Sequence, residues 1–153
     1  MFVELFILTS MVIPEVLQLM FEYDAFLSFA SHDEEIVKPL WQELCQNGLR
    51  VFWSDASLKS SIGQSWFDVI QNSLINSEHL ILICTTNSMK SEWVKEEYQT
   101  FYSQCYLKSN KKRRLILKLE DSFNVDSLPP FLKNIQATTS IKLNFRSEKS
   151  YLN

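Results

Sequence analysis

Glycine is unusually scarce in this chain: Gly48 and Gly63 are the only two among 153 residues. A dinucleotide-binding fingerprint needs three closely spaced glycines, and a phosphate loop needs a GxxxxGK pattern, so the sequence excludes both. A site that handles nucleotides through a glycine-rich turn is therefore ruled out.

Cysteine is scarce as well, and the three residues Cys45, Cys84 and Cys105 show no CxxC spacing. An odd number of cysteines in apolar or helical segments is typical of reduced, buried thiols in the cytoplasm. His32 has no second histidine, cysteine or acid at metal-ligand spacing. We therefore expect a cytoplasmic protein without a bound metal.

The chain has no excess of basic residues, since 15 Lys and Arg stand against 18 Asp and Glu, for a net charge of -3. Nothing in this balance favours nucleic acid as a partner. A local basic run, KSNKKRR at 108–114, follows a predicted helix and precedes a predicted strand. We interpret it as solvation of the helix end rather than as a nucleic-acid contact.

Residues 1–21 are strongly apolar, but Glu4, Pro14 and Glu15 interrupt the run. About ten uncharged residues remain, whereas a membrane-spanning helix needs roughly 20. The first basic residue is Lys38, which does not fit a signal peptide. We expect a short packing or oligomerisation segment, or the edge of an upstream domain, and a membrane tether is the alternative.

From residue 22 onward, strand-like and helix-like segments alternate. At 46% apolar and 22% charged residues, the chain can bury the core of one domain. Strands are predicted at 23–29, 49–53, 79–84, 114–119 and 138–143, and helices at 34–47, 64–76 and 88–108, with a helical turn at Pro129-Pro130. Such alternation predicts an α/β fold with a parallel sheet and helices on both faces. Ligands of these folds bind at the carboxyl ends of the strands.

A candidate carboxylate lies in the third helix, just after the most apolar strand. Trp93, Glu97 and Phe101 are four residues apart and share one helical face. An acid on an aromatic face near a strand end is positioned to meet a substrate cation. Glu96 lies about 100° away around the helix and is the alternative inward acid. Taken alone, helical glutamates of this kind are more often ordinary surface charges.

Three segments, in order, resemble Toll/interleukin-1 receptor (TIR) domains. Tyr23–Ser28 (YDAFLS) is similar to the opening strand motif (Y/F)DxF(I/L)S of the family. Gly48–Phe52 and the loop 54–63 are similar to its second strand and its BB loop. Ser91-x-Trp93-Val94-x-x-Glu97 is similar to the SxWVxxE helix of catalytic, particularly bacterial, TIR domains.

The resemblance implies a three-layer, flavodoxin-like TIR fold with a five-stranded parallel sheet over 22–146. Residues 1–21 then form an apolar extension and 147–153 a short tail. Two departures stand out. The loop from Leu58 to Gly63 is about two residues longer than is usual in the family, and the final helix is expected to be short or missing because the chain ends at Asn153.

The resemblance also implies an activity: cleavage of the nicotinamide–ribose bond of NAD⁺, to ADP-ribose or a cyclic isomer, often in anti-phage defence. It assigns the catalytic role to Glu97 rather than Glu96. NAD⁺ is then a substrate, and no cofactor is needed. The implied substrate-binding residues are Phe29, Ala30, Ser31, Lys59 and Trp93.

The implied partners are other TIR domains, contacted through the BB loop at 54–63. A rival interpretation keeps only these contacts and makes the chain a non-catalytic interaction module, and fold alone does not separate the two. A phospho-receiver or flavin-binding domain of similar topology is disfavoured. A receiver needs an aspartate at the end of the third strand, where Cys84-Thr85 stands, and the Ala30–Asp33 turn is too acidic for a flavin phosphate.

Overall fold

The computed structural model describes residues 21–54, 64–107, 113–135 and 137–138. Its strands form one parallel sheet in the order β2-β1-β3-β4-β5. Their bounds are β1 Tyr23–Ser28, β2 Val51–Trp53, β3 Ser77–Cys84, β4 Arg114–Leu119 and β5 Ala137–Thr138. The predicted parallel α/β architecture is thereby confirmed.

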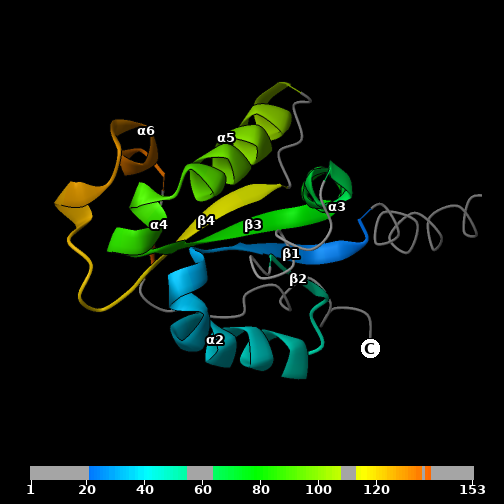
Figure 1. The fold of residues 1–153 in the computed structure, drawn as a ribbon, viewed down its shortest axis with the longest axis horizontal. Helices are drawn as coiled ribbons and strands as arrows, with labels where there is room; N and C mark the ends of the chain where they lie inside the picture. The colour runs from blue at the N-terminus through cyan, green and yellow to red at the C-terminus, as the bar shows by residue number, and fades with distance from the viewer. Residues whose placement is uncertain (1–20, 55–63, 108–112, 136, 139–153) are drawn as a thin grey trace, which may run out of the picture.

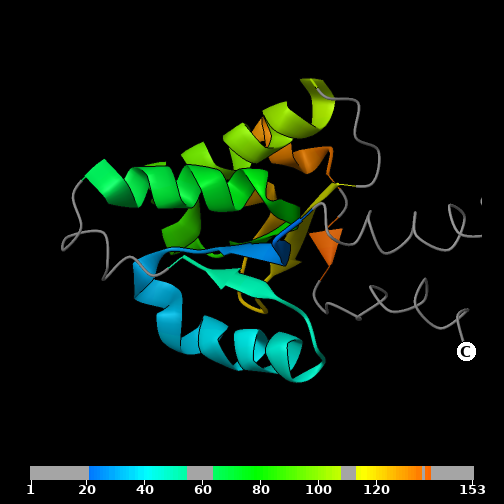
Figure 2. The ribbon, with the colours of Figure 1, turned by 90° about the vertical axis from the view of Figure 1, so that its right-hand side faces the viewer.

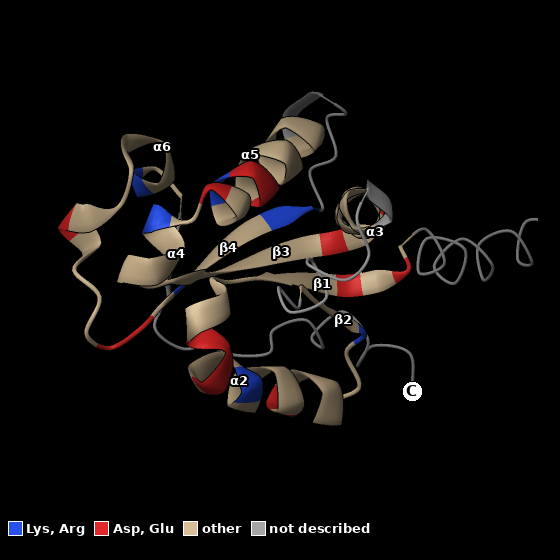
Figure 3. Ribbon diagram, in the orientation of Figure 1, with Lys and Arg blue, Asp and Glu red and all other residues tan. Residues whose placement is uncertain are grey.

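Helices lie on both faces of this sheet. Their bounds are η1 Ser31–Asp33, α2 Glu34–Gln46, α3 Gln64–Ile75, α4 Thr86–Lys90, α5 Glu92–Leu107, η3 Val125–Ser127 and α6 Pro130–Lys133. Among the described helices, α2 covers one face and α3 and α5 lie across the other (Figures 1 and 2). Acidic and basic residues are interspersed along the outer helices rather than gathered into a stripe of one sign (Figure 3).

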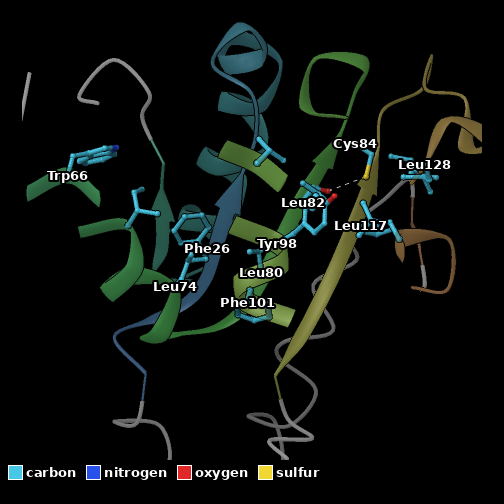
Figure 4. Packing of buried hydrophobic residues seen from close by; sticks show 14 residues of the cluster. Phe26, Trp66, Leu74, Leu80, Leu82, Cys84, Tyr98, Phe101, Leu117 and Leu128 are labelled. Carbon is cyan, nitrogen blue, oxygen red and sulfur yellow. Dashed lines mark hydrogen bonds between the residues drawn. The ribbon is translucent and has the colours of Figure 1, made fainter. Parts of the chain in front are cut away.

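The sheet has a separate hydrophobic cluster on each face, because successive strand residues point in opposite directions. Phe26 and Leu80 pack with Leu74 of α3 and Phe101 of α5 on one face (Figure 4). On the other face Ala25, Leu27, Ile81 and Ile83 pack against Val37 and Leu44 of α2. β3 is buried along almost its whole length, as its unbroken apolar sequence predicts for a central parallel strand.

Three local predictions are wrong. The predicted helix at 88–108 is two helices, because Ser91 between them is extended (φ -82°, ψ 117°) and its hydroxyl accepts from the Val94 amide at 3.3 Å to cap α5. The helical spacing of apolar residues in 34–47 and 64–76 also predicts that Ile36 and Phe67 face inward, but they are 52% and 43% exposed. Each lies one residue, or about 100°, away from the buried face of its helix.

The basic run also differs from its prediction at one position within the described residues. Arg113 is buried, and its guanidinium donates to the backbone oxygens of Leu74 and Ser77 at 2.7 and 2.9 Å. The guanidinium also lies 4.5 Å from the Phe101 ring centroid. Arg113 therefore ties β4 to the end of α3 and the start of β3 instead of solvating a helix end.

Several predictions concern residues outside the described ranges. They are the apolar extension up to residue 20, the loop residues 55–63 with Lys59, the fifth strand beyond Thr138, the final helix and the tail at 147–153. Within the described part of the chain, no helix is both long enough and apolar enough to cross a membrane.

Candidate functional site

The carboxylate of Glu97 lies inside the protein, at the carboxyl edge of the sheet, and its residue is only 2% exposed. The Ser28 hydroxyl donates to Oε2 of Glu97 at 2.6 Å, and the Ser54 hydroxyl donates to Oε1 at 3.1 Å. Ser28 is the last residue of β1, and Ser54 directly follows β2. Hydroxyls from the ends of two adjacent parallel strands therefore hold both oxygens of one carboxylate.

Glu97 reaches this position because it occupies a core register of α5. Val94 and Phe101, three residues before it and four after it, are buried on the same helical face. A carboxylate at such a position costs free energy unless hydrogen bonds replace its water. The two serine hydroxyls supply those bonds, so the fold stabilises a carboxylate at this position.

The neighbouring Glu96 is exposed on the outer face of α5. The interpretation in which Glu96 is the inward acid is therefore wrong, and Glu97 is the one turned toward the sheet. The residue spacing alone leaves this choice open, because either glutamate faces inward after a rotation of one residue.

Trp93 stands one helical turn before Glu97, in the first turn of α5, and is 41% exposed. Its ring lies 6.4 Å from that of Phe67 on α3, tilted by 51°. The two half-exposed rings form an aromatic pair that bridges α3 and the first turn of α5. Trp93 is thus placed where a planar group could stack, and its predicted role in substrate binding stays a prediction.

The loop after β1 combines buried residues with two exposed side chains, Ser31 and His32. Phe29 is 4% exposed and packs on Trp53 with ring centroids 4.6 Å apart, so its side chain belongs to the core on the α2 face. Ala30 is also buried, whereas Ser31 is exposed. Lys59, the remaining predicted binding residue, lies outside the described residues.

A second buried acid, Asp33, lies at the same edge and was not predicted from the sequence. Asp33 is 4% exposed and accepts hydrogen bonds from the side chains of Thr85, Asn87 and Ser88. Ser28 and Ser54 were predicted only as parts of motifs and not as hydrogen-bond donors to Glu97. The one available signal was position, since each of these polar residues comes at or soon after the end of a strand.

Two other reactive side chains of the described region, Cys84 and His79, are poorly suited to chemistry at this site. Burial raises the pKa of the Cys84 thiol to about 12, which makes it a poor nucleophile at neutral pH. Burial lowers the pKa of His79 to about 4, and this histidine lies near the opposite, amino-terminal end of β3. No cluster of three potential metal ligands occurs among the described residues.

The TIR domain family matches residues 25–150, which is most of the chain. Among curated proteins, a 2′ cyclic ADP-D-ribose synthase, AbTIR from Acinetobacter baumannii, is 36% identical over 77 residues. This alignment covers 50% of the present chain and 28% of the A. baumannii protein. The chain therefore spans well under half the length of that relative.

Two solved structures share the fold. The TIR domain of the Toll-related receptor TRR-2 from Hydra magnipapillata has a TM-score of 0.58 at 18% identity, over 84% of this chain and 94% of that one. A TIR-STING receptor from C. gigas has a TM-score of 0.59 at 24% identity, over 76% of this chain and 37% of that one. The family match over residues 25–150, together with this shared architecture, shows that the chain belongs to the TIR domain family.

Proposed function

We propose that this protein is an NAD⁺ glycohydrolase that cleaves the bond between nicotinamide and ribose, with Glu97 as its catalytic carboxylate. The observation that carries the proposal is the pair of serine hydroxyls, from two adjacent strand ends, that fix both oxygens of Glu97. Family membership and the 36% identity to a cyclic ADP-ribose synthase support it.

In the proposed reaction, the bond from the nicotinamide nitrogen to ribose C1′ breaks, and its electron pair leaves with nicotinamide. The departing ring becomes neutral, so it needs neither a general acid nor a metal. Positive charge moves to the ribose as an oxocarbenium ion, which a nearby carboxylate stabilises. Water then adds to C1′ and loses a proton to give ADP-ribose. Attack by a hydroxyl of the same molecule gives a cyclic isomer instead.

Glu97 suits this role because its position is fixed before the substrate arrives. A carboxylate held on both oxygens does not have to reorganise when positive charge develops beside it. At 2% exposure, however, Glu97 meets a substrate only after neighbouring groups move. Ser54 directly follows β2, and a shift of this residue would release one of the two hydroxyls and leave Oε1 for a ribose hydroxyl.

The remaining substrate contacts belong to the same proposal. Trp93 offers a half-exposed ring one turn from Glu97 for stacking on a base. Phe29, Ala30 and Ser31 border the site from the end of β1, and Lys59 belongs to the BB loop. We place the activity in the cytoplasm, as an immune or anti-phage effector or a producer of a signal nucleotide.

The decisive experiment incubates the purified protein with NAD⁺ and measures nicotinamide release for wild type, Glu97→Gln and Glu96→Gln. We expect Glu97→Gln to lose activity by at least about a hundredfold, because a neutral amide does not stabilise the oxocarbenium ion. Glu96→Gln removes the same charge from the exposed face of the same helix and should keep wild-type activity. Equal release by wild type and Glu97→Gln would remove Glu97 from its role.

A non-catalytic TIR–TIR interaction module is the second candidate. The near-complete burial of Glu97 favours it, because a structural carboxylate needs no access to substrate. The assay must therefore include crowded or assembled protein, since contacts between TIR domains through the segment 54–63 are part of the proposal. Absence of nicotinamide release under all of these conditions would leave the interaction module as the function.

A further inference from the structure

A buried aspartate that the proposed chemistry does not use lies at the same edge of the sheet as Glu97. Asp33, at the end of η1, is only 4% exposed. Asn87 Nδ2 donates to its Oδ1 atom at 2.7 Å, and the hydroxyls of Thr85 and Ser88 donate to its Oδ2 atom. Thr85 caps α4 directly after β3, and Asn87 and Ser88 lie in the first turn of α4. Asp33 therefore joins the loop after β1 to the start of α4.

The three partners require a carboxylate at this position. The Thr85 hydroxyl accepts from the Ser88 amide at 2.9 Å, so its proton is directed to Asp33. The Nδ2 group of Asn87 can only donate a hydrogen bond. An ionised carboxylate accepts from all of these groups at once, whereas an amide would place its own N–H donors against some of them. The network consequently depends on the charge of Asp33 and not only on its size.

Ser88 extends the network to the loop that follows Ser28. Its hydroxyl makes a long contact of 3.5 Å to Asp33 Oδ2 and accepts from the Ala30 amide at 3.2 Å. Ser88 is 1% exposed, so water does not easily replace either bond. The Ala30 N–H is therefore already engaged inside the protein and does not serve as a donor to a bound phosphate or ribose.

We propose that Asp33 is a positioning residue for substrate binding, acting through Ser88 on the backbone at Ala30. This proposal rests on the proposed NAD⁺ activity. The network fixes the course of the chain immediately after Ser28, and it leaves the side chains of Ser31 and His32 exposed on the substrate side of this loop. Asp33 does not touch the reacting atoms, and its effect is on how tightly NAD⁺ binds rather than on bond cleavage.

The test compares wild type, Asp33→Asn and Glu34→Gln by two measurements. Glu34 is adjacent in the chain and exposed, so Glu34→Gln makes the same change of charge without touching the network. The first measurement is hydrogen exchange at the Ala30 amide, which should be at least about tenfold faster in Asp33→Asn because the bond to Ser88 is loosened. The second is the KM and kcat of nicotinamide release. We expect KM to rise by about fivefold or more while kcat stays within about twofold of wild type.

A second variant keeps the proposal testable if Asp33→Asn does not fold. Ser88→Ala removes the link to Ala30 but leaves Thr85 and Asn87 bound to Asp33, and it should change both measurements in the same direction. Unchanged exchange at Ala30 in the folded variants would overturn the network, and faster exchange with an unchanged KM would overturn its role in substrate binding. If wild type releases no nicotinamide, the proposed function fails and the substrate part of this proposal fails with it. The exchange rates would still decide whether Asp33 fixes the loop.

Discussion

The Ser28 hydroxyl donates to Oε2 of Glu97 at 2.6 Å and so joins the last residue of β1 to the middle of α5, 69 residues away in sequence. Both residues are buried: Ser28 is completely inaccessible to solvent, and Glu97 is 2% exposed. A hydrogen bond to a charged acceptor in such surroundings is among the stronger ones in a protein. This bond explains why a serine, rather than a further apolar residue, ends the first strand.

We predict that Ser28→Ala lowers both activity and stability. Loss of the hydroxyl leaves one oxygen of a buried carboxylate without this donor, which should reduce the free energy of unfolding by about 1–3 kcal/mol. It also frees the carboxylate to rotate, which should reduce the kcat of nicotinamide release by about tenfold or more. Urea unfolding and the nicotinamide assay measure the two effects.

Ser77→Ala is the matched control for Ser28→Ala. Ser77 is also a fully buried strand serine whose hydroxyl makes a 2.6 Å bond. It differs because it lies at the amino-terminal end of β3, away from Glu97, and donates to the backbone oxygen of Ser73. We expect a comparable loss of stability with unchanged kcat. If both variants lose kcat to the same extent, the effect of Ser28 is a general loss of packing and not the positioning of Glu97.

The arrangement of strands and helices follows from features that the sequence displays locally. The apolar run in β3 and the four-residue spacing of Ile70 and Leu74 in α3 need no distant partner to be recognised. The predictions were wrong where a single residue determines the local structure. Ser91 lies within a predicted helix, but its hydroxyl caps the start of α5, and Phe67 is apolar yet exposed.

The candidate site was less predictable because its residues are joined across long distances in sequence. Residue spacing left Glu96 and Glu97 equivalent, and only the family motif favoured Glu97 before the structure placed it inward. Asp33 and its partner Thr85 are 52 residues apart, and each alone is typical of a turn or a helix cap. Local patterns carry no information about such pairs.

We predict that Arg113→Met destabilises the fold far more than Arg114→Met. Arg113 is 9% exposed, donates to two backbone oxygens and stacks on Phe101, while Arg114 is exposed. Unsatisfied buried carbonyls and the lost ring contact should cost about 2–4 kcal/mol, against about 0.5 kcal/mol or less for Arg114. Urea unfolding of both variants provides the comparison, and equal losses would contradict a structural role for the buried guanidinium.

Native cysteine labelling should single out Cys84 as the protected thiol. Cys84 is completely buried at the end of β3 and its pKa is raised to about 12, whereas Cys45 is partly exposed on α2. At pH 8 we expect iodoacetamide to alkylate Cys84 at least about a hundredfold more slowly than Cys45, because both thiolate and access are lacking. Peptide mass spectrometry quantifies this. In urea the two rates should converge, and rapid native labelling of Cys84 would show that the end of β3 opens.

Stability should fall on mild acidification because of His79. Burial, together with the positive charges of Arg114 and Arg113, lowers the pKa of His79 to about 4, although Asp24 acts in the opposite direction. In the unfolded chain its pKa is about 6.5. Between these values the unfolded state binds a proton that the folded state does not, so the free energy of unfolding decreases as the pH falls. From pH 7 to pH 5 this loss should be about 2 kcal/mol.

His79→Asn should remove this pH dependence while keeping an acceptor for the Arg114 amide, which donates to Nδ1 of His79 at 3.2 Å. We expect the difference in unfolding free energy between pH 7 and pH 5, measured in urea, to shrink by about 2 kcal/mol relative to wild type. His32→Asn makes the same substitution at an exposed position on η1 and is the control. Wild type and His79→Asn share every other titrating group. An unchanged pH dependence in His79→Asn would therefore mean that this histidine is protonated equally in the folded and unfolded states.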